Sequence, residues 1–259
     1  MSKGSPLLSL IKEKPKDEIP SSRHARKKLY IAKTEELWQE QPDKYLPDRH
    51  LIDTLRIERS WSLLQSHLTK EALAILDLGC GFSPLAKFLD NHQLTFLDSS
   101  SQALKKFPGK KVLHDALPIT KLDEEQYDLV ICTDLIAELF PQDYRLAMGE
   151  IARLMTKDGK ALISTPLDIH SLDALEKFLA LLDTEFEIIS LSKSYHRLAV
   201  SWLERLKRWK FLRKFSTLGS QHLKRSRKTI LWLEKISHFL WDEDAVSHVI
   251  VLVKRKPLF

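Results

Sequence analysis

The chain reads Ala74-Ile75-Leu76-Asp77-Leu78-Gly79-Cys80-Gly81-Phe82-Ser83-Pro84-Leu85 at the point that decides its fold. The apolar run at the start of this stretch is typical of a buried strand, and two glycines follow it. Gly79 and Gly81 lack a Cβ, so the backbone there can adopt a positive φ and let a ligand approach the main chain closely. Pro84 suits the first turn of a helix. We therefore predict a strand, a glycine turn and a helix whose free N–H groups face a bound ligand.

The spacing of these residues distinguishes between two kinds of cofactor. A dinucleotide-binding turn would place a third glycine at position 84, where this chain has Pro84. The segment instead resembles motif I of the class I S-adenosylmethionine-dependent methyltransferases, written Asp/Glu-x-Gly-x-Gly-x-Gly. Asp77, Gly79 and Gly81 match that motif, and Ser83 stands in the place of its third glycine.

Three segments further along the chain resemble later motifs of the same family. Residues 94–100 contain Asp98, whose ionised carboxylate offers only acceptors, as two vicinal ribose hydroxyls require. In residues 112–118 the resemblance places Asp115 at the adenine amino group, with the Ala116 N–H facing the ring. Residues 127–134 resemble the fourth strand, whose end borders the methionine moiety. The resemblance thus implies S-adenosylmethionine as cofactor, with these binding residues: Asp77, Gly79, Cys80, Gly81, Asp98, Ser99, Asp115, Ala116 and Thr133.

Hydrophobic periodicity predicts the rest of the fold. Short apolar segments predict strands at residues 73–78, 94–98, 111–114, 128–132, 160–164, 186–191 and 248–253. Amphipathic helices alternate with them, and the clearest runs from Tyr144 through Met155 and stops before Gly159. This alternation is typical of an α/β protein with a Rossmann-like, seven-stranded, mainly parallel sheet that carries helices on both faces.

We expect the chain to divide into a loose leader (1–22), an N-terminal helical extension (23–70), a cofactor-binding core (71–196), a basic helical insertion (197–245) and the last core strand (246–259). Residues 150–166 resemble the end of the methyltransferase domain shared by many small-molecule enzymes, including those of quinone biosynthesis. In most of that family the last two strands form a near-continuous hairpin. The insertion is therefore the part peculiar to this chain.

Composition narrows the environment in which we expect the protein to work. A chain of 259 residues allows one sizeable α/β core with appendages. Cys80 and Cys132 are its only cysteines, which excludes a disulfide framework and a cysteine-ligated metal site and fits a reducing cytoplasm. The apolar residues 6–11 are too short for a signal sequence, and no uncharged stretch approaches the roughly 18 residues of a membrane span. We expect a cytoplasmic protein without a transmembrane segment.

The insertion concentrates the positive charge of the chain, whose net charge is +6. Residues 197–235 contain twelve Lys and Arg against Glu204 and Glu234. Helical spacing puts Trp202, Leu206 and Trp209 on one side of a first helix. A second helix carries a broader apolar stripe, made of Thr229, Trp232, Leu233, Ile236, Phe239 and Leu240. Residues 197–241 could form a lid at a membrane surface, contact RNA, or pack as an ordinary core with a basic exterior.

The predicted chemistry is methyl transfer by direct in-line displacement, for which the protein aligns the acceptor, excludes water and, for a hydroxyl acceptor, removes a proton. The candidate bases are Glu138, His170 and Asp134, and we expect no metal ion. Tyr195 and His196 are weaker candidates.

We expect a small or lipid-soluble acceptor, methylated on oxygen or carbon. Ribosomal or transfer RNA is the alternative, because residues 81–86 are similar to the Gly-x-Asn-Pro turn of the ribosomal RNA methyltransferases that confer aminoglycoside resistance, with Ser83 in place of asparagine. A protein that binds S-adenosylmethionine without catalysis and docks a partner is a third possibility.

Overall fold

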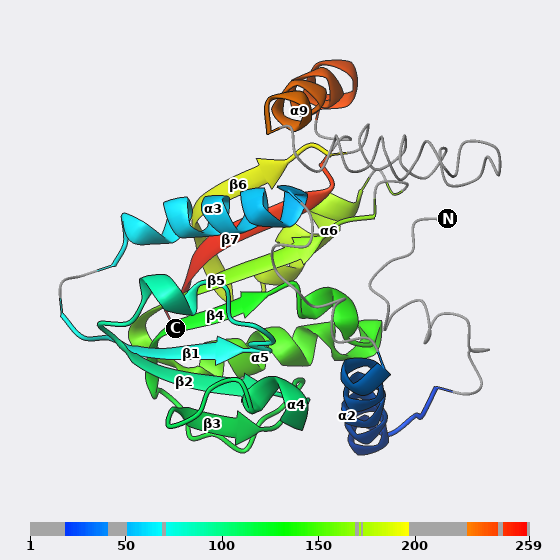
Figure 1. The fold of residues 1–259 in the computed structure, drawn as a ribbon. Coiled ribbons are helices and arrows are strands. Elements are labelled where there is room, and N and C mark those ends of the chain that lie inside the picture. Colours follow the sequence, from blue (N-terminus) through cyan, green and yellow to red (C-terminus); the bar gives the residue numbers. More distant parts are fainter. Residues whose placement is uncertain are drawn as a thin grey trace.

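The computed structural model describes residues 19–40, 51–68, 71–168, 171, 173–196, 227–242 and 246–257. Within these ranges the sheet has seven strands in the order β3-β2-β1-β4-β5-β7-β6 (Figure 1). The strands are β1 (Ala74–Leu78), β2 (Gln93–Asp98), β3 (Lys111–His114), β4 (Tyr127–Thr133), β5 (Met155–Pro166), β6 (Phe186–Ser194) and β7 (His248–Arg255). Strands β1 to β5 pair in parallel, and β7 runs antiparallel to both β5 and β6. The predicted sheet is therefore confirmed.

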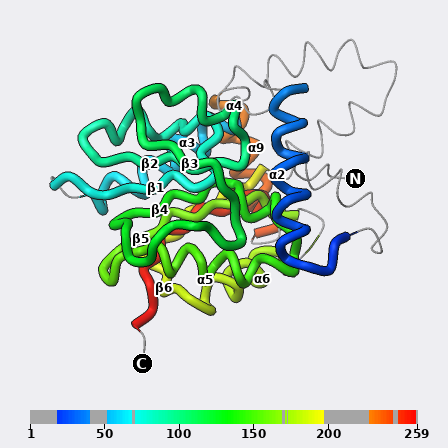
Figure 2. The backbone as a smooth tube through the Cα atoms, turned by 90° about the horizontal axis from the view of Figure 1, so that it is seen from below, coloured from blue at the N-terminus to red at the C-terminus, as the bar shows by residue number. Residues whose placement is uncertain are grey.

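Alternate side chains of the central strands enter two different cores, one on each face of the sheet. Leu76 and Leu78 of β1 belong to the core that α5 (Tyr144–Leu154) and α6 (Ala174–Leu182) cover. Ile75 belongs to the other core, against which α3 (Leu51–Gln65) packs. Figure 2 shows α5 and α6 on one side of the strands and α3 on the opposite side. Burial on both faces explains why β1 reads as an almost continuous apolar run.

The helix α2 (Arg23–Glu40) stands beside the carboxyl ends of the parallel strands (Figures 1 and 2). Near its start, the Arg26 guanidinium donates to both carboxylate oxygens of Asp143, at 2.8 and 2.5 Å. Asp143 ends the short helix η5 (Pro141–Asp143). Near the other end of α2, Glu35 accepts hydrogen bonds from the N–H and hydroxyl of Ser101, at the start of α4 (Ser101–Leu104). These contacts fix α2 across the edge of the sheet where β1, β2 and β4 end.

Two predicted helix boundaries are wrong. No α-helix opens at Pro84; the chain forms i→i−3 turns that lead into the short 3₁₀ helix η3 (Ala86–Phe88). Immediately before Pro84, Ser83 has φ +45° and donates its hydroxyl to the buried Asp77 carboxylate. The helix α5 ends at Leu154, because Met155 already has an extended backbone and starts β5.

The helix α9 (Arg227–Trp241) is the described part of the insertion, and it turns an unexpected face inward. Its buried residues are Ile230, Glu234 and Ser237. Of the predicted apolar stripe, Leu233 and Ile236 are half-buried, whereas Trp232 is 61% and Phe239 87% exposed, so this part of the stripe does not pack as core. The helix with Trp202 and Trp209 lies outside the described residues. No helix in the described ranges is long and apolar enough to cross a membrane.

Two ion-pair bonds explain the orientation of α9. Arg59 of α3 donates to both carboxylate oxygens of Glu234, each at 2.7 Å. Glu234 also accepts from the backbone N–H of Tyr195 at 2.9 Å. A carboxylate with these donors is stable only on the inner side of the helix, since turning the apolar stripe inward would break the bonds.

Candidate functional site

The glycine turn after β1 has the backbone geometry that the sequence predicts. Gly79 has φ +73° and Gly81 φ +49°, both in the left-handed region that favours glycine. A Cβ added to Gly79 would lie 2.8 Å from a methyl carbon of Leu135. The N–H groups of Gly79 and Cys80 donate to the carbonyl of Leu97, at 2.8 and 3.0 Å. The turn is therefore held against the end of β2.

Asp98 links this turn to the end of β2. Its two carboxylate oxygens accept from the Gly81 N–H and the Ser100 N–H, each at 2.8 Å. Burial raises the pKa of Asp98, although these amide donors and His114 act in the opposite direction. Each oxygen keeps acceptor capacity beyond its one amide donor, which is the property needed to bind hydroxyls.

A cavity of about 170 Å³ opens beside the turn. Seven of the predicted cofactor residues line it: Gly79, Gly81, Asp98, Ser99, Asp115, Ala116 and Thr133. Cys80 lines a neighbouring cavity instead, and Asp77 lies below the turn, 4% exposed and bonded to Ser83. Burial raises the pKa of Asp77 to about 7. Asp77 therefore supports the turn, while the ends of β1, β2 and β4 supply the lining.

Three residues of α2 also line this cavity, and sequence reasoning missed them. Tyr30, Thr34 and Trp38 recur every four residues, so they share one face of the helix and point toward the strand ends. The Trp38 ring packs against Phe82 with 5.2 Å between ring centroids. The helical spacing of these residues was a signal in the sequence, but only the docking of α2 shows what they face.

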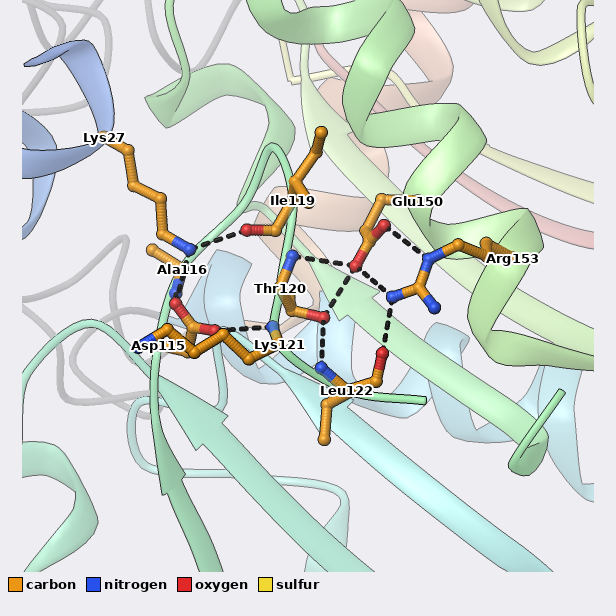
Figure 3. Close-up of polar contacts among 9 residues, drawn as sticks. All are labelled: Lys27, Asp115, Ala116, Ile119, Thr120, Lys121, Leu122, Glu150 and Arg153. Carbon is orange, nitrogen blue, oxygen red and sulfur yellow. Dashed lines mark hydrogen bonds and ion pairs between the residues drawn. The ribbon is translucent and has the colours of Figure 1, made fainter. Parts of the chain in front are cut away.

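Asp115 differs in one respect from its predicted role (Figure 3). The Ala116 N–H, which was expected to face a ring, donates to the Asp115 carboxylate at 2.9 Å. Lys27 of α2 pairs with the same oxygen at 2.5 Å, and the Lys121 N–H donates to the other at 2.9 Å. Burial opposes ionisation, but Lys27 and the two amides hold the pKa of Asp115 below its ordinary value. Asp115 is thus ionised and connects α2 to the cavity wall.

The loop after Asp115 is shaped by a second carboxylate, also shown in Figure 3. Glu150 of α5 accepts from the N–H and hydroxyl of Thr120, at 2.8 and 2.6 Å. Arg153 bonds Glu150 and also donates to the carbonyl of Leu122 at 2.7 Å. These bonds fix residues 115–122 on α5 and so hold the cavity wall in place.

A second cavity, of about 280 Å³, adjoins the first. The two share the lining residues Gly79, Gly81, Thr133 and Asp134. The rest of its lining comes from α3, the glycine turn and the strand ends: Asp53, Arg56, Ile57, Ser60, Cys80, Phe82, Pro84, Leu85, Ser164 and His248. Together the two cavities fall within the range of about 300–1,000 Å³ typical of ligand sites.

Asp134 stands at the boundary between the cavities, directly after β4, with φ +59°. One of its carboxylate oxygens accepts from the Ser164 hydroxyl at 2.8 Å and contacts His248 Nε2 at 2.6 Å. Burial opposes ionisation, yet His248, Arg56 and Ser164 hold the pKa of Asp134 well below its usual range. Burial also lowers the pKa of His248, although Asp134 acts in the opposite direction. Beside a carboxylate, which only accepts when ionised, His248 Nε2 carries the hydrogen and donates it to Asp134. His248 is a site residue that the sequence analysis missed.

The other candidate bases are placed less favourably. Glu138, on the short helix η4 (Ile136–Glu138), lines the first cavity, and burial raises its pKa to about 8 with a contribution from Asp134. His196 lines neither cavity, and burial lowers its pKa to about 4. His170 lies outside the described residues.

The first cavity fits the cofactor that the motifs imply. A side chain at Gly79 would collide with Leu135 in the cavity wall, so glycine keeps the cavity open at this point. Asp98 offers acceptors for hydroxyls. Tyr30 and Trp38 provide flat apolar surface for a planar ring. The roles of the individual residues as cofactor contacts remain predictions.

Comparison with known proteins gives an independent view of the fold. Residues 76–161 match the family model described as a methyltransferase domain. Among solved structures, the chain resembles the 1,6-didemethyltoxoflavin-N1-methyltransferase of Burkholderia thailandensis, solved with 1,6-didemethyltoxoflavin and S-adenosylhomocysteine: 14% identity, 94% of each chain covered, TM-score 0.59. It also resembles the N-methyltransferase NodS of Bradyrhizobium japonicum, solved with S-adenosylhomocysteine: 13% identity, 88% of this chain and 100% of that one covered, TM-score 0.55.

One curated relative is an uncharacterised protein of Methanocaldococcus jannaschii, 29% identical over 116 residues. The match covers 44% of this chain and spans half the length of the relative. The matched family model covers β1 through most of β5, which is the part of the fold that carries the glycine turn and most of the lining of the first cavity. Residues 76–161 therefore match a methyltransferase domain, and the chain shares the fold of methyltransferases that were solved with S-adenosylhomocysteine.

Proposed function

We propose that this protein transfers a methyl group from S-adenosylmethionine to a small-molecule acceptor held in the second cavity. The observation that carries the proposal is that two cavities adjoin at Gly79, Gly81, Thr133 and Asp134. One is lined by the predicted cofactor residues, and the other is large enough for a single ring, since a cavity of about 150 Å³ holds benzene. The similar Burkholderia structure, which was solved with 1,6-didemethyltoxoflavin and S-adenosylhomocysteine, supports this class of acceptor.

The residues of the chain would divide the work by position. S-adenosylmethionine supplies a methyl group on a positively charged sulfur, so the protein has mainly to bind, align and exclude water. Asp98 and the glycine turn would hold the cofactor, and Tyr30 and Trp38 of α2 would exclude water from it. Asp134, fixed by His248, would face both ligands at the shared boundary and orient the O–H of an acceptor.

We further propose that the acceptor is lipid-soluble and methylated on oxygen or carbon, and that α9 rests on a membrane surface. Exposed Trp232, Phe239 and Leu240 stand on α9 with exposed Lys228 and Lys235. Tryptophan beside basic residues suits the headgroup region of an anionic membrane. Co-sedimentation with anionic vesicles tests this placement, and a shift of bulk RNA in a gel would support the RNA alternative instead.

Titration calorimetry tests the cofactor half of the proposal. The wild type is expected to bind S-adenosylmethionine and S-adenosylhomocysteine, and Asp98→Ala is expected to weaken both at least tenfold by removing the hydroxyl acceptors. Asp90→Ala, at an exposed aspartate outside both cavities, is the matched control and should bind like the wild type.

Transfer itself is tested with radiolabelled S-adenosylmethionine, offered with a cell extract divided into small-molecule, lipid and RNA fractions. Label is expected in the small-molecule or lipid fraction. Label in RNA alone would overturn the proposed acceptor class. Binding without labelling of any fraction would favour a non-catalytic protein.

A further inference from the structure

We propose that the second cavity recognises its acceptor through two adjacent polar groups, which form a paired polar edge. Arg56 donates hydrogen bonds to an oxygen of the acceptor molecule, and Asp134 accepts a hydrogen bond from a neighbouring O–H of the same molecule. The acceptor would then be a small, ring-sized molecule that carries a carboxylate or carbonyl oxygen next to the group to be methylated. This inference rests on the proposed function and names the substrate class of the same site.

Arg56 is the first half of this edge. It projects from α3 into the lining of the second cavity, and its guanidinium makes no hydrogen bond to any described residue. Its two ion pairs are long, 3.7 Å to Asp53 and 3.9 Å to Asp134. Its buried Nε also lacks a partner. A planar group with five donors is thus left with its hydrogen-bonding capacity unused beside a cavity.

The neighbouring Arg59, on the same helix, uses its donors in hydrogen bonds within the protein. Arg59 donates to both carboxylate oxygens of Glu234 at 2.7 Å and to the Ser194 hydroxyl at 2.6 Å. It lines neither cavity. Arg59 therefore stabilises the fold, whereas the donors of Arg56 face a cavity that could hold a ligand.

Asp134 is the second half of the edge. His248 and Ser164 both bond the same carboxylate oxygen of Asp134, while the other oxygen has only the long contact to Arg56 among the described residues. The side chain is 45% exposed and lines both cavities. One ionised oxygen is therefore left to accept a hydrogen bond, 3.9 Å from unused guanidinium donors.

The chemistry of these two groups restricts what can bind across them. A guanidinium prefers the oxygens of a carboxylate or carbonyl, which it bonds in its own plane. A carboxylate oxygen needs an O–H or N–H donor. A ring with a hydroxyl next to a carboxylate or a carbonyl meets both demands at once. A simple amine would satisfy Asp134 but leave Arg56 facing a positive charge.

The test uses 2-hydroxybenzoate and 2-hydroxybenzamide as probes, because they share the hydroxyl and differ in whether the adjacent oxygen belongs to a carboxylate or a carbonyl. Phenol and benzoate each lack one half of the edge. Binding is measured by titration calorimetry on the protein loaded with S-adenosylhomocysteine. At least one two-part probe is expected to bind at least tenfold more tightly than phenol and benzoate, and the better probe identifies the class of oxygen.

The Arg56→Gln variant is expected to weaken the better probe at least tenfold and phenol less than twofold, with S-adenosylhomocysteine binding unchanged. Arg56→Lys keeps the charge but loses the planar donors, so its affinity for the better probe should fall between that of the wild type and that of Arg56→Gln. Arg145→Gln, at an exposed arginine on α5 outside both cavities, is the matched control. Thermal unfolding of each variant checks that it is folded.

Two results would overturn the inference: neither two-part probe binds better than phenol and benzoate, or Arg56→Gln binds the better probe as well as the wild type does. Failure of the unmodified protein to bind S-adenosylhomocysteine is a separate outcome, because it contradicts the proposed function before the acceptor cavity is examined.

Discussion

Replacing Gly79 by alanine tests how the glycine turn shapes the cofactor cavity. The backbone at Gly79 has φ +73°, which costs an alanine about 1–2 kcal/mol. The new Cβ would also lie 2.8 and 2.9 Å from the two methyl carbons of Leu135, an overlap that costs about 1–3 kcal/mol. We therefore expect Gly79→Ala to reduce the free energy of unfolding by about 2–5 kcal/mol.

The chain provides a matched control at Gly109. Its φ of +72° is nearly the same, but nothing lies within 4 Å of an added Cβ. Gly109→Ala should therefore show the backbone cost alone, about 1–2 kcal/mol. Urea unfolding gives both values, and their difference measures the overlap with Leu135. The double variant Gly79→Ala/Leu135→Ala removes that overlap and completes the cycle.

Cofactor binding gives the second readout. Leu135 lines the first cavity, so the added methyl group should displace it and weaken S-adenosylhomocysteine binding in Gly79→Ala but not in Gly109→Ala. Equal loss of stability in the two variants, together with unchanged affinity in Gly79→Ala, would refute the reasoning.

Three further predictions concern the charged groups. Arg26→Ala leaves the buried Asp143 without its partner, so we expect a loss of about 3–5 kcal/mol in urea unfolding, and the double variant with Asp143→Ala should recover part of it; no recovery would contradict the pairing. Because burial raises the pKa of Glu138 to about 8, ionising Glu138 costs stability, which falls as the pH rises from about 4.5 through 8; the advantage of Glu138→Gln over the wild type should grow across that window, and a pH-independent difference would argue against it. His248→Gln keeps an N–H donor for Asp134 and should be more stable than His248→Leu by about 1–3 kcal/mol near neutral pH, whereas equal stability would show that the bond contributes nothing.

The sheet could be predicted because its signals are local. Each buried strand is an apolar run, and each of β1, β2 and β4 carries or precedes an aspartate at the edge where ligands bind in such folds. The missing helix at Pro84 could not be predicted in the same way. The chain there follows a turn in which Ser83 bonds Asp77, and a bond across a folded turn is not described by any propensity.

The orientation of α9 could not be predicted from the sequence either, because it also depends on a contact between distant residues. A stripe of apolar residues at helical spacing usually faces a core. In this protein the bonds of Arg59 with Glu234, 175 residues apart in the chain, turn the neighbouring face with Ile230, Glu234 and Ser237 inward. A long-range pair of charges therefore overrides a strong local pattern.

What the sequence by itself determined is the parallel sheet, the glycine turn and the positions of the acids that border the first cavity, because the periodicity and the motif spacing lie within short stretches. Only the tertiary structure decided the rest of the site. Tyr30 and Trp38 reach the cavity through the docking of α2, and His248 meets Asp134 across 114 residues of chain. Such contacts depend on how distant elements pack together, so the second cavity and its polar edge exist only in the folded chain.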